Sequence, residues 1–125
     1  MNVPDDRSYT DQHEWVMQEG EQVRIGITDY AQDALGDIVY VDLPDAGAKF
    51  GLDETLAEVE STKSVGEVYA PIAGTVVAAN SILADAPETI NSDPYGAGWI
   101  VTLAPESADP LQGMLDAAAY SALIA

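Results

Sequence analysis

The sequence predicts a mainly β protein with a sandwich-like or barrel-like arrangement of short strands. Segments rich in valine, isoleucine and aromatic residues recur along the chain, and turn residues separate them at close spacing. Helical features occur in only two places, around residues 28–36 and in the C-terminal tail. The length of 125 residues suits one hydrophobic core, so we expect residues 1–125 to form a single domain.

The N-terminal half begins with residues 1–7, which we expect to be loose, and continues with a hairpin. Residues 9–17 form a first strand entered through a polar turn, residues 20–21 reverse the chain, and residues 23–27 alternate as a second strand. This pattern predicts two neighbouring antiparallel strands.

A short helix is expected between Thr28 and Gly36. Thr28 suits the start of a helix, because its side-chain oxygen can accept a free backbone N–H, and Gly36 suits its end. Residues 37–43 give the strongest strand signal in the chain, since they are rich in branched residues and end at Pro44.

A second hairpin is predicted in the middle of the chain. Residues 57–60 alternate apolar and acidic side chains, residues 68–72 form a second run, and Lys63 lies in the small polar turn between them. Further strands are expected at residues 74–79 and 99–103, with an irregular stretch at residues 80–98.

The tail is predicted to be helical over residues 109–123, with Asp109 as its capping residue and Pro110 in its first position. One face of this helix would carry the apolar side chains of Leu111, Met114, Leu115, Ala118 and Ala122. We expect this face to pack against the sheets, and docking of a partner is the alternative.

The charge of the chain excludes several classes of partner. Four lysine and arginine residues stand against 22 aspartate and glutamate residues, which gives a net charge of −18. So acidic a protein is unsuited to nucleic acid or to an anionic membrane surface. The acidity suits either steering towards basic surfaces of partner enzymes or solubility alone, and both explanations stay open.

The absence of cysteine excludes disulfides, thiolate nucleophiles and cysteine metal sites, so sulfur redox chemistry would need a bound group. No apolar run approaches the length of a membrane span, and residues 1–6 lack the basic and apolar regions of a secretory signal. We therefore expect a cytoplasmic protein, bacterial, or alternatively the mature form of a mitochondrial one.

Little in the sequence supports catalysis. His13 is the single histidine, so a histidine metal cluster is impossible, and neither a Gly-x-Ser-x-Gly elbow nor a phosphate-binding loop is present. Glu58 and Glu60 alternate on one strand face, where a solvated surface is a better explanation than acid–base chemistry. We expect a non-catalytic protein with no metal site.

Lys63 is one of only four cationic side chains, and its place in a hairpin turn makes it a candidate functional residue. An exposed turn lysine is ordinarily a solvated surface residue, and while it keeps its proton it is a poor nucleophile. It is better suited as an attachment point, because its four-carbon stem and an acyl group would form a long flexible arm.

Several motifs, in the same order along the chain, resemble those of the H protein family of the glycine cleavage system, which carries lipoyl groups. The matching segments are Tyr9-Thr10, His13-Glu14-Trp15-Val16, residues 26–32, residues 35–44, Val59-Glu60-Ser61-Thr62-Lys63-Ser64, residues 69–74, residues 77–80, residues 91–96 and Gly98-Trp99. The resemblance covers residues from about 8 to 103.

The resemblance implies a hybrid, or barrel-sandwich, lipoyl-carrier fold of two antiparallel sheets with a short helix in the N-terminal half and a C-terminal helix. It also implies lipoic acid in amide linkage to Lys63. A pyridoxal-phosphate glycine decarboxylase would load the arm with an aminomethyl group, and a tetrahydrofolate-dependent aminomethyltransferase would unload it. A flavin-dependent dihydrolipoyl dehydrogenase would reoxidise the arm, and a lipoylating enzyme would attach it.

The same resemblance implies roles for three acidic residues. Glu60 matches the acid three positions before the lysine, which the lipoylating enzyme would recognise, and Glu14 and Glu67 match a cleft that shelters the loaded arm. His13 is expected to pack beside Trp15. The chain departs from the family at Thr62, Glu67 and Gln12, where valine, aspartate and serine are common, and the change at Gln12 weakens the cleft assignment.

Three alternatives remain. Another swinging-arm carrier is disfavoured, because biotin carriers flank their lysine with methionines and dehydrogenase lipoyl domains usually carry Asp-Lys-Ala. An unmodified acidic interaction module is disfavoured by the intact Glu-Ser-x-Lys-Ser turn. A lipoyl carrier that donates lipoyl groups to other lipoate-dependent enzymes would keep the same lysine.

Overall fold

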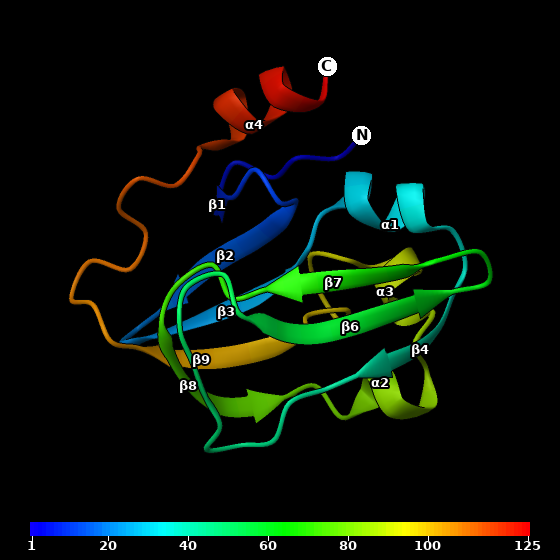
Figure 1. The fold of residues 1–125 in the computed structure, drawn as a ribbon. Helices are drawn as coiled ribbons and strands as arrows, with labels where there is room; N and C mark the ends of the chain where they lie inside the picture. The colour runs from blue at the N-terminus through cyan, green and yellow to red at the C-terminus, as the bar shows by residue number, and fades with distance from the viewer.

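Two antiparallel sheets, one lying over the other, form the body of the molecule, as a computed structural model of residues 1–125 shows (Figure 1). The strands are β1 (Ser8–Tyr9), β2 (Glu14–Glu19), β3 (Gln22–Ile27), β4 (Ile38–Asp42), β5 (Lys49–Phe50), β6 (Thr55–Ser61), β7 (Val65–Tyr69), β8 (Gly74–Ala79) and β9 (Val101–Pro105). The helices are α1 (Asp29–Leu35), α2 (Ile82–Asp85), α3 (Thr89–Ser92) and α4 (Ala117–Ile124). The larger sheet has the order β1-β2-β3-β9-β8-β5 and the smaller β4-β6-β7, which confirms the predicted mainly β fold.

The main hydrophobic core lies between the two sheets. Val23 and Ile25 of β3 and Leu103 of β9 enter it from the larger sheet, and Val59 of β6 and Val68 of β7 enter it from the smaller one. Burial of each such side chain stabilises the fold by about 1.5–3 kcal/mol. Because side chains alternate along a strand, the residues between these core positions face the surface or a second cluster.

A smaller aromatic cluster lies beside β2 and consists of Tyr9, Trp15 and Tyr120. The rings of Tyr9 and Tyr120 are stacked with their centroids 4.8 Å apart, which attaches α4 to β1. Trp15 pairs with Gly26 across β2 and β3, and a Cβ on Gly26 would lie 2.6 Å from the indole. Glycine is therefore the only residue that leaves room for this ring.

The short helix α1 forms for the reasons that the sequence predicted. Thr28 is its N-cap, with Oγ1 accepting the Ala31 N–H at 3.2 Å, and Asp29 lies in its first turn. Gly36 ends it with φ 84°, a backbone conformation that glycine adopts readily. The residues after α1 then enter β4.

The predicted helix over residues 109–123 is wrong at its start. The helix begins at Ala117, and Asp116 rather than Asp109 caps it by accepting the Ala119 N–H at 2.8 Å. Two features exclude the earlier start: Gly113 has φ 82°, and Leu115 exchanges two backbone hydrogen bonds of 2.8 Å with Tyr9. An extended pairing of this kind competes with a helix over the same residues.

Residues 1–7, which the sequence predicts to be loose, form no helix or strand but contact the rest of the chain. The backbone N–H of Asn2 donates to Asp29 at 3.0 Å, and the Tyr95 hydroxyl donates to the carbonyl of Asn2 at 2.6 Å. The Arg7 guanidinium lies over the Trp15 ring at 4.6 Å from its centroid. The N-terminal segment therefore lies close to α1, as the ribbon in Figure 1 also shows.

Candidate functional site

The turn between β6 and β7 presents Lys63. Ser61 closes this turn, since its Oγ accepts the N–H groups of Lys63 at 3.3 Å and Ser64 at 3.1 Å. The backbone N–H of Ser61 also donates to the carbonyl of Ser64 at 2.8 Å, and that of Thr62 donates to the Asp37 carbonyl at 3.1 Å. The tip of the hairpin is thus held from inside and is also attached to the start of β4.

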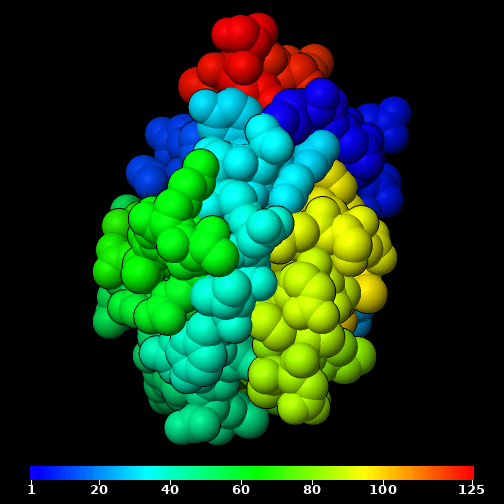
Figure 2. Space-filling view, turned by 90° about the vertical axis from the view of Figure 1, so that its right-hand side faces the viewer, coloured from blue at the N-terminus to red at the C-terminus, as the bar shows by residue number.

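The Lys63 side chain is exposed and belongs to neither of the two ion pairs in the molecule. Its stem passes over the end of α1, where a Cβ on Gly36 would lie 3.4 Å from its Cε. The same end of α1 supports the hairpin, because a Cβ on Gly66 would lie 3.1 Å from Leu35. Figure 2 shows the green hairpin tip beside the cyan α1 segment on an open surface, where a second protein could reach the amine.

The outer face of the small sheet carries acidic side chains near this tip, which we call the acidic face (Asp42, Glu58, Glu60 and Glu67). Glu58 pairs with Asp42 of β4 on one side and with Glu67 of β7 on the other. Three carboxylates in one row repel one another, so this row does not contribute to stability. Glu60 lies in the next row between Tyr40 and Val65, on the strand that leads to the turn.

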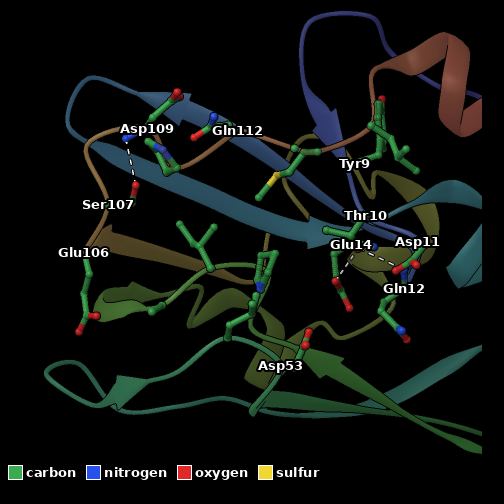
Figure 3. Close-up of a pocket in the computed structure, with 18 residues that line it drawn as sticks. Tyr9, Thr10, Asp11, Gln12, Glu14, Asp53, Glu106, Ser107, Asp109 and Gln112 are labelled. Carbon is green, nitrogen blue, oxygen red and sulfur yellow. Dashed lines mark hydrogen bonds between the residues drawn. The ribbon is translucent and has the colours of Figure 1, made fainter.

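A cavity of about 810 Å³ opens between the start of β2 and the segment before α4 (Figure 3). Its apolar wall includes Tyr9, Leu52, Pro71, Ile72, Met114 and Leu115. Its acidic side chains are Asp11, Glu14, Asp53, Glu106 and Asp109, and no lysine or arginine lines it. Such a cavity suits a ligand that is apolar along its length and cationic at one end.

Glu14 is the buried acid of this cavity, with 2% of its surface exposed. One carboxylate oxygen accepts the Thr10 hydroxyl at 2.7 Å, and the other accepts the backbone N–H of Tyr69 at 3.3 Å. Burial raises the pKa of Glu14 to about 7; the two hydrogen bonds oppose the rise, and Asp53 and Asp11 add to it. A cation in the cavity would favour the ionised form.

The structure separates the two acids that the sequence assigned to one cleft. Glu14 lines the cavity, whereas Glu67 does not and lies exposed on the acidic face, where it accepts the Tyr69 hydroxyl at 2.7 Å. Tyr69 connects them, because its N–H binds Glu14 and its hydroxyl binds Glu67. Glu67 therefore lies on β7, the strand that runs from the Lys63 turn towards the cavity.

Sequence reasoning missed most of the acids in the cavity. Asp11 lies between the matching segments Tyr9-Thr10 and His13-Glu14-Trp15-Val16 and belongs to neither, and Asp109 was expected to cap a helix. No pattern in the sequence singled out Asp53. In the structure its φ of 68° marks an unusual turn. These residues come from separate segments, which only the fold brings together.

His13 does not pack beside Trp15, contrary to the prediction. Its φ of 68° turns it towards Tyr30 and Tyr120, and its Nδ1 lies 2.8 Å from the Tyr120 hydroxyl. That hydroxyl is 2.7 Å from Oγ1 of Thr28, so a buried polar chain links α4 to the cap of α1. Burial lowers the pKa of His13, which favours its neutral ring in this chain.

Comparison with known proteins agrees with this geometry. A family model described as glycine cleavage H-protein matches residues 7–125. The chain belongs to the glycine cleavage H-protein family. The H protein of Anaeromyxobacter sp. (strain K) is 49% identical over 124 residues, covering 99% of this chain and 97% of that protein. The H protein of Beutenbergia cavernae is 52% identical over 123 residues, covering 98% and 97%. The crystal structure of the H protein from Mycobacterium marinum superposes with a TM-score of 0.87 at 42% identity and covers 96% of this chain and 97% of that one.

Membership in the H-protein family brings the general function with it. Proteins of this family are lipoyl carriers of the glycine cleavage system, are not themselves catalysts, and hold lipoate covalently on a lysine. Their partners in that system include the glycine decarboxylase and the aminomethyltransferase. Family membership therefore excludes the alternatives of a biotin carrier and a dehydrogenase lipoyl domain.

None of the helices has both the length and the apolar character that a membrane span requires.

Proposed function

We propose that Lys63 is the lysine that carries the lipoyl group of this H-protein family member. The observation that carries the proposal is an exposed amine, free of ion pairs, at the tip of a hairpin whose backbone is fixed by Ser61. The chain offers one other lysine, Lys49, which lies in the two-residue strand β5 and not in such a turn. The surroundings of Lys63 therefore suit a lipoyl amide, since both the amine and the arm have room.

The chain's own residues would hold and shelter what the arm carries. When bound, the lipoyl group would supply the disulfide of its dithiolane ring, which is reduced as one of its sulfurs takes up the aminomethyl group of glycine. Glu14 would bind the protonated amine of that cargo, and the apolar wall near Leu115 would exclude water from it. Glu67, on the strand that leads to the cavity, would attract the same charge on its way in.

Two further partners would act on this carrier. The lipoylating enzyme would recognise Glu60, which lies on the strand that ends at the turn. Dihydrolipoyl dehydrogenase would reoxidise the arm. The proposed setting is the cytoplasm of a bacterium, because the relatives described above are bacterial. Residues 1–125 would act as a single carrier unit.

Intact-mass measurement on the protein isolated from cells with an active lipoylation pathway tests the proposal. The wild type and Lys49→Arg should both show a lipoyl increment, and Lys63→Arg should show none. A lipoyl increment in Lys63→Arg, or an adduct of a different mass in the wild type, would contradict the assignment. Glycine decarboxylation reconstituted with the partner enzymes then distinguishes a carrier in glycine cleavage from a donor of lipoyl groups.

A further inference from the structure

The hydroxyl of Thr10 contacts the buried acid of the cavity. Its Oγ1 lies 2.7 Å from Oε1 of Glu14, the shortest polar contact of that carboxylate (Figure 3). The same oxygen accepts two backbone N–H groups, from Gln12 at 3.2 Å and from Glu14 itself at 3.4 Å. Thr10 thus receives two hydrogen bonds and has one proton to give.

The direction of that proton follows from these contacts. Two N–H donors occupy the lone pairs of the hydroxyl oxygen, so its hydrogen points towards the remaining neighbour, Oε1 of Glu14. A hydroxyl fixed as a donor stabilises the ionised carboxylate and also fixes the direction of its oxygens. Thr10 therefore acts on both the charge and the orientation of Glu14.

The surroundings of Glu14 make this donor important. The titratable groups that interact with the carboxyl are Asp11, Asp53, Tyr69 and Tyr120, and each of these can carry only a negative charge. No lysine or arginine lines the cavity to oppose them. Burial and these acids favour the neutral carboxyl, and only the Thr10 hydroxyl and the Tyr69 N–H favour the ionised one.

We propose that Thr10 is a positioning residue that favours the ionised form of Glu14 and directs its carboxylate into the cavity, so that the cavity can hold a cationic amine. The inference rests on the proposed function for its last step, the binding of the amine. Its first step, the control of Glu14 by Thr10, is a property of the chain alone. The two steps are therefore tested separately.

The first test follows the side-chain carboxyl carbon of Glu14 by NMR during a pH titration of the full-length, unlipoylated protein. Thr10→Val and Thr10→Ala remove the hydroxyl, and loss of one charge-assisted hydrogen bond should raise the midpoint for Glu14 by about one pH unit. Thr10→Ser keeps the hydroxyl and should restore the wild-type midpoint. An unchanged midpoint in both Thr10→Val and Thr10→Ala, with the fold intact by NMR, would overturn the proposal.

The second test measures how fast the loaded carrier loses its aminomethyl group to water across a pH series. Thr10→Val should move the pH profile of this loss upward by the same amount as the carboxyl midpoint, and Thr10→Ser should not. In a Glu14→Gln background, Thr10→Val should have no further effect, because its target no longer titrates. A Thr10→Val effect that persists at full size in that background would overturn the proposal.

The two tests separate failure of this inference from failure of the proposed function. If Thr10→Val shifts the Glu14 midpoint but neither Thr10→Val nor Glu14→Gln changes the loss of the aminomethyl group, the control of Glu14 by Thr10 is supported. The same result would contradict the binding of the amine at Glu14, which belongs to the proposed function.

Discussion

The Lys63 turn and the Glu14 cavity are built in opposite ways. The turn is exposed, its lysine has no ion-pair partner, and only its backbone is held, by Ser61 and by the start of β4. Glu14 is 2% exposed, and both of its carboxylate oxygens are engaged. The contrast suits the proposed function: an arm attached to Lys63 would be free to move, whereas the proposed receiving site holds its acid still.

Replacement of Glu14 tests the contrast with the largest expected effect on stability. Its pKa is raised from 4.5 to about 7 on folding, so between these values the folded chain binds more protons than the unfolded one, and stability falls as pH rises. The shift corresponds to a loss of about 3 kcal/mol. Glu14→Gln lacks this loss. The difference between its unfolding free energy and that of wild type should therefore change by about 3 kcal/mol in favour of the variant between about pH 4 and pH 8.

Denaturant unfolding at several pH values measures this difference. Glu67→Gln is the matched control, because it makes the same substitution at an exposed carboxylate that solvent screens. Parallel pH profiles for Glu14→Gln and wild type would show that Glu14 is not a buried titrating acid.

Two glycines compare the packing of the two regions. In Gly26→Ala the new methyl would lie 2.6 Å from the Trp15 indole, which is fully buried, so we expect a loss of about 3 kcal/mol. In Gly66→Ala the methyl meets the flexible end of Leu35 at 3.1 Å, and we expect a loss below about 1 kcal/mol. Thermal unfolding measures the stability of both variants. Equal losses of stability would contradict rigid packing around Trp15 and adaptable packing at the hairpin.

Gly36 links α1 to the lysine and should show a smaller effect on stability. Its φ of 84° and ψ of −157° lie in a region essentially restricted to glycine, so Gly36→Ala should cost about 1–2 kcal/mol. The added methyl would also lie 3.4 Å from Lys63 Cε and should slow lipoylation. Gly20→Ala is the control, since Gly20 also has a positive φ but no atom within 4 Å of its Cβ position. Equal lipoylation rates in the two variants would refute a role for the Gly36 contact.

The smallest effect is expected at the exposed hydroxyl of Tyr69. Tyr69→Phe removes its 2.7 Å hydrogen bond to Glu67 but leaves the backbone N–H that binds Glu14. The stability should change by less than about 0.5 kcal/mol, because the bond is exposed to solvent. Urea unfolding measures this change, and substitutions at the surface usually stay within about 0.5 kcal/mol. A loss above about 1 kcal/mol would show that Glu67 is held as firmly as Glu14.

Local features of this fold were predictable because their causes lie within a few residues. Thr28 and Gly36 bound α1 through contacts made inside one helix, and alternation placed Val59 inside and Glu58 and Glu60 outside. The position of Lys63 in a turn follows from the same alternation. These parts of the hairpin needed no information from distant residues.

The features that failed depend on contacts between distant segments. The start of α4 is set by pairing between Leu115 and Tyr9, and the side chain of His13 is directed by Tyr120, 107 residues later. The acids of the cavity come from the β1–β2 connection, the turn at Asp53 and the segment before α4. The resemblance implied that Glu14 lies in a cleft, and Glu14 lines the cavity. The resemblance also implied that Glu67 lies in the same cleft, but Glu67 does not line the cavity.

An arm attached at the exposed Lys63 should deliver a cationic group to the buried Glu14. Nuclear Overhauser measurements on the lipoylated protein, before and after loading with the aminomethyl group, follow the position of the arm. We expect new contacts on loading between the arm and the methyl groups of Ile72, Met114 and Leu115, which line the cavity. These contacts should be weaker in Glu14→Gln. Contacts that stay confined to the hairpin and α1 after loading would contradict delivery of the group to Glu14.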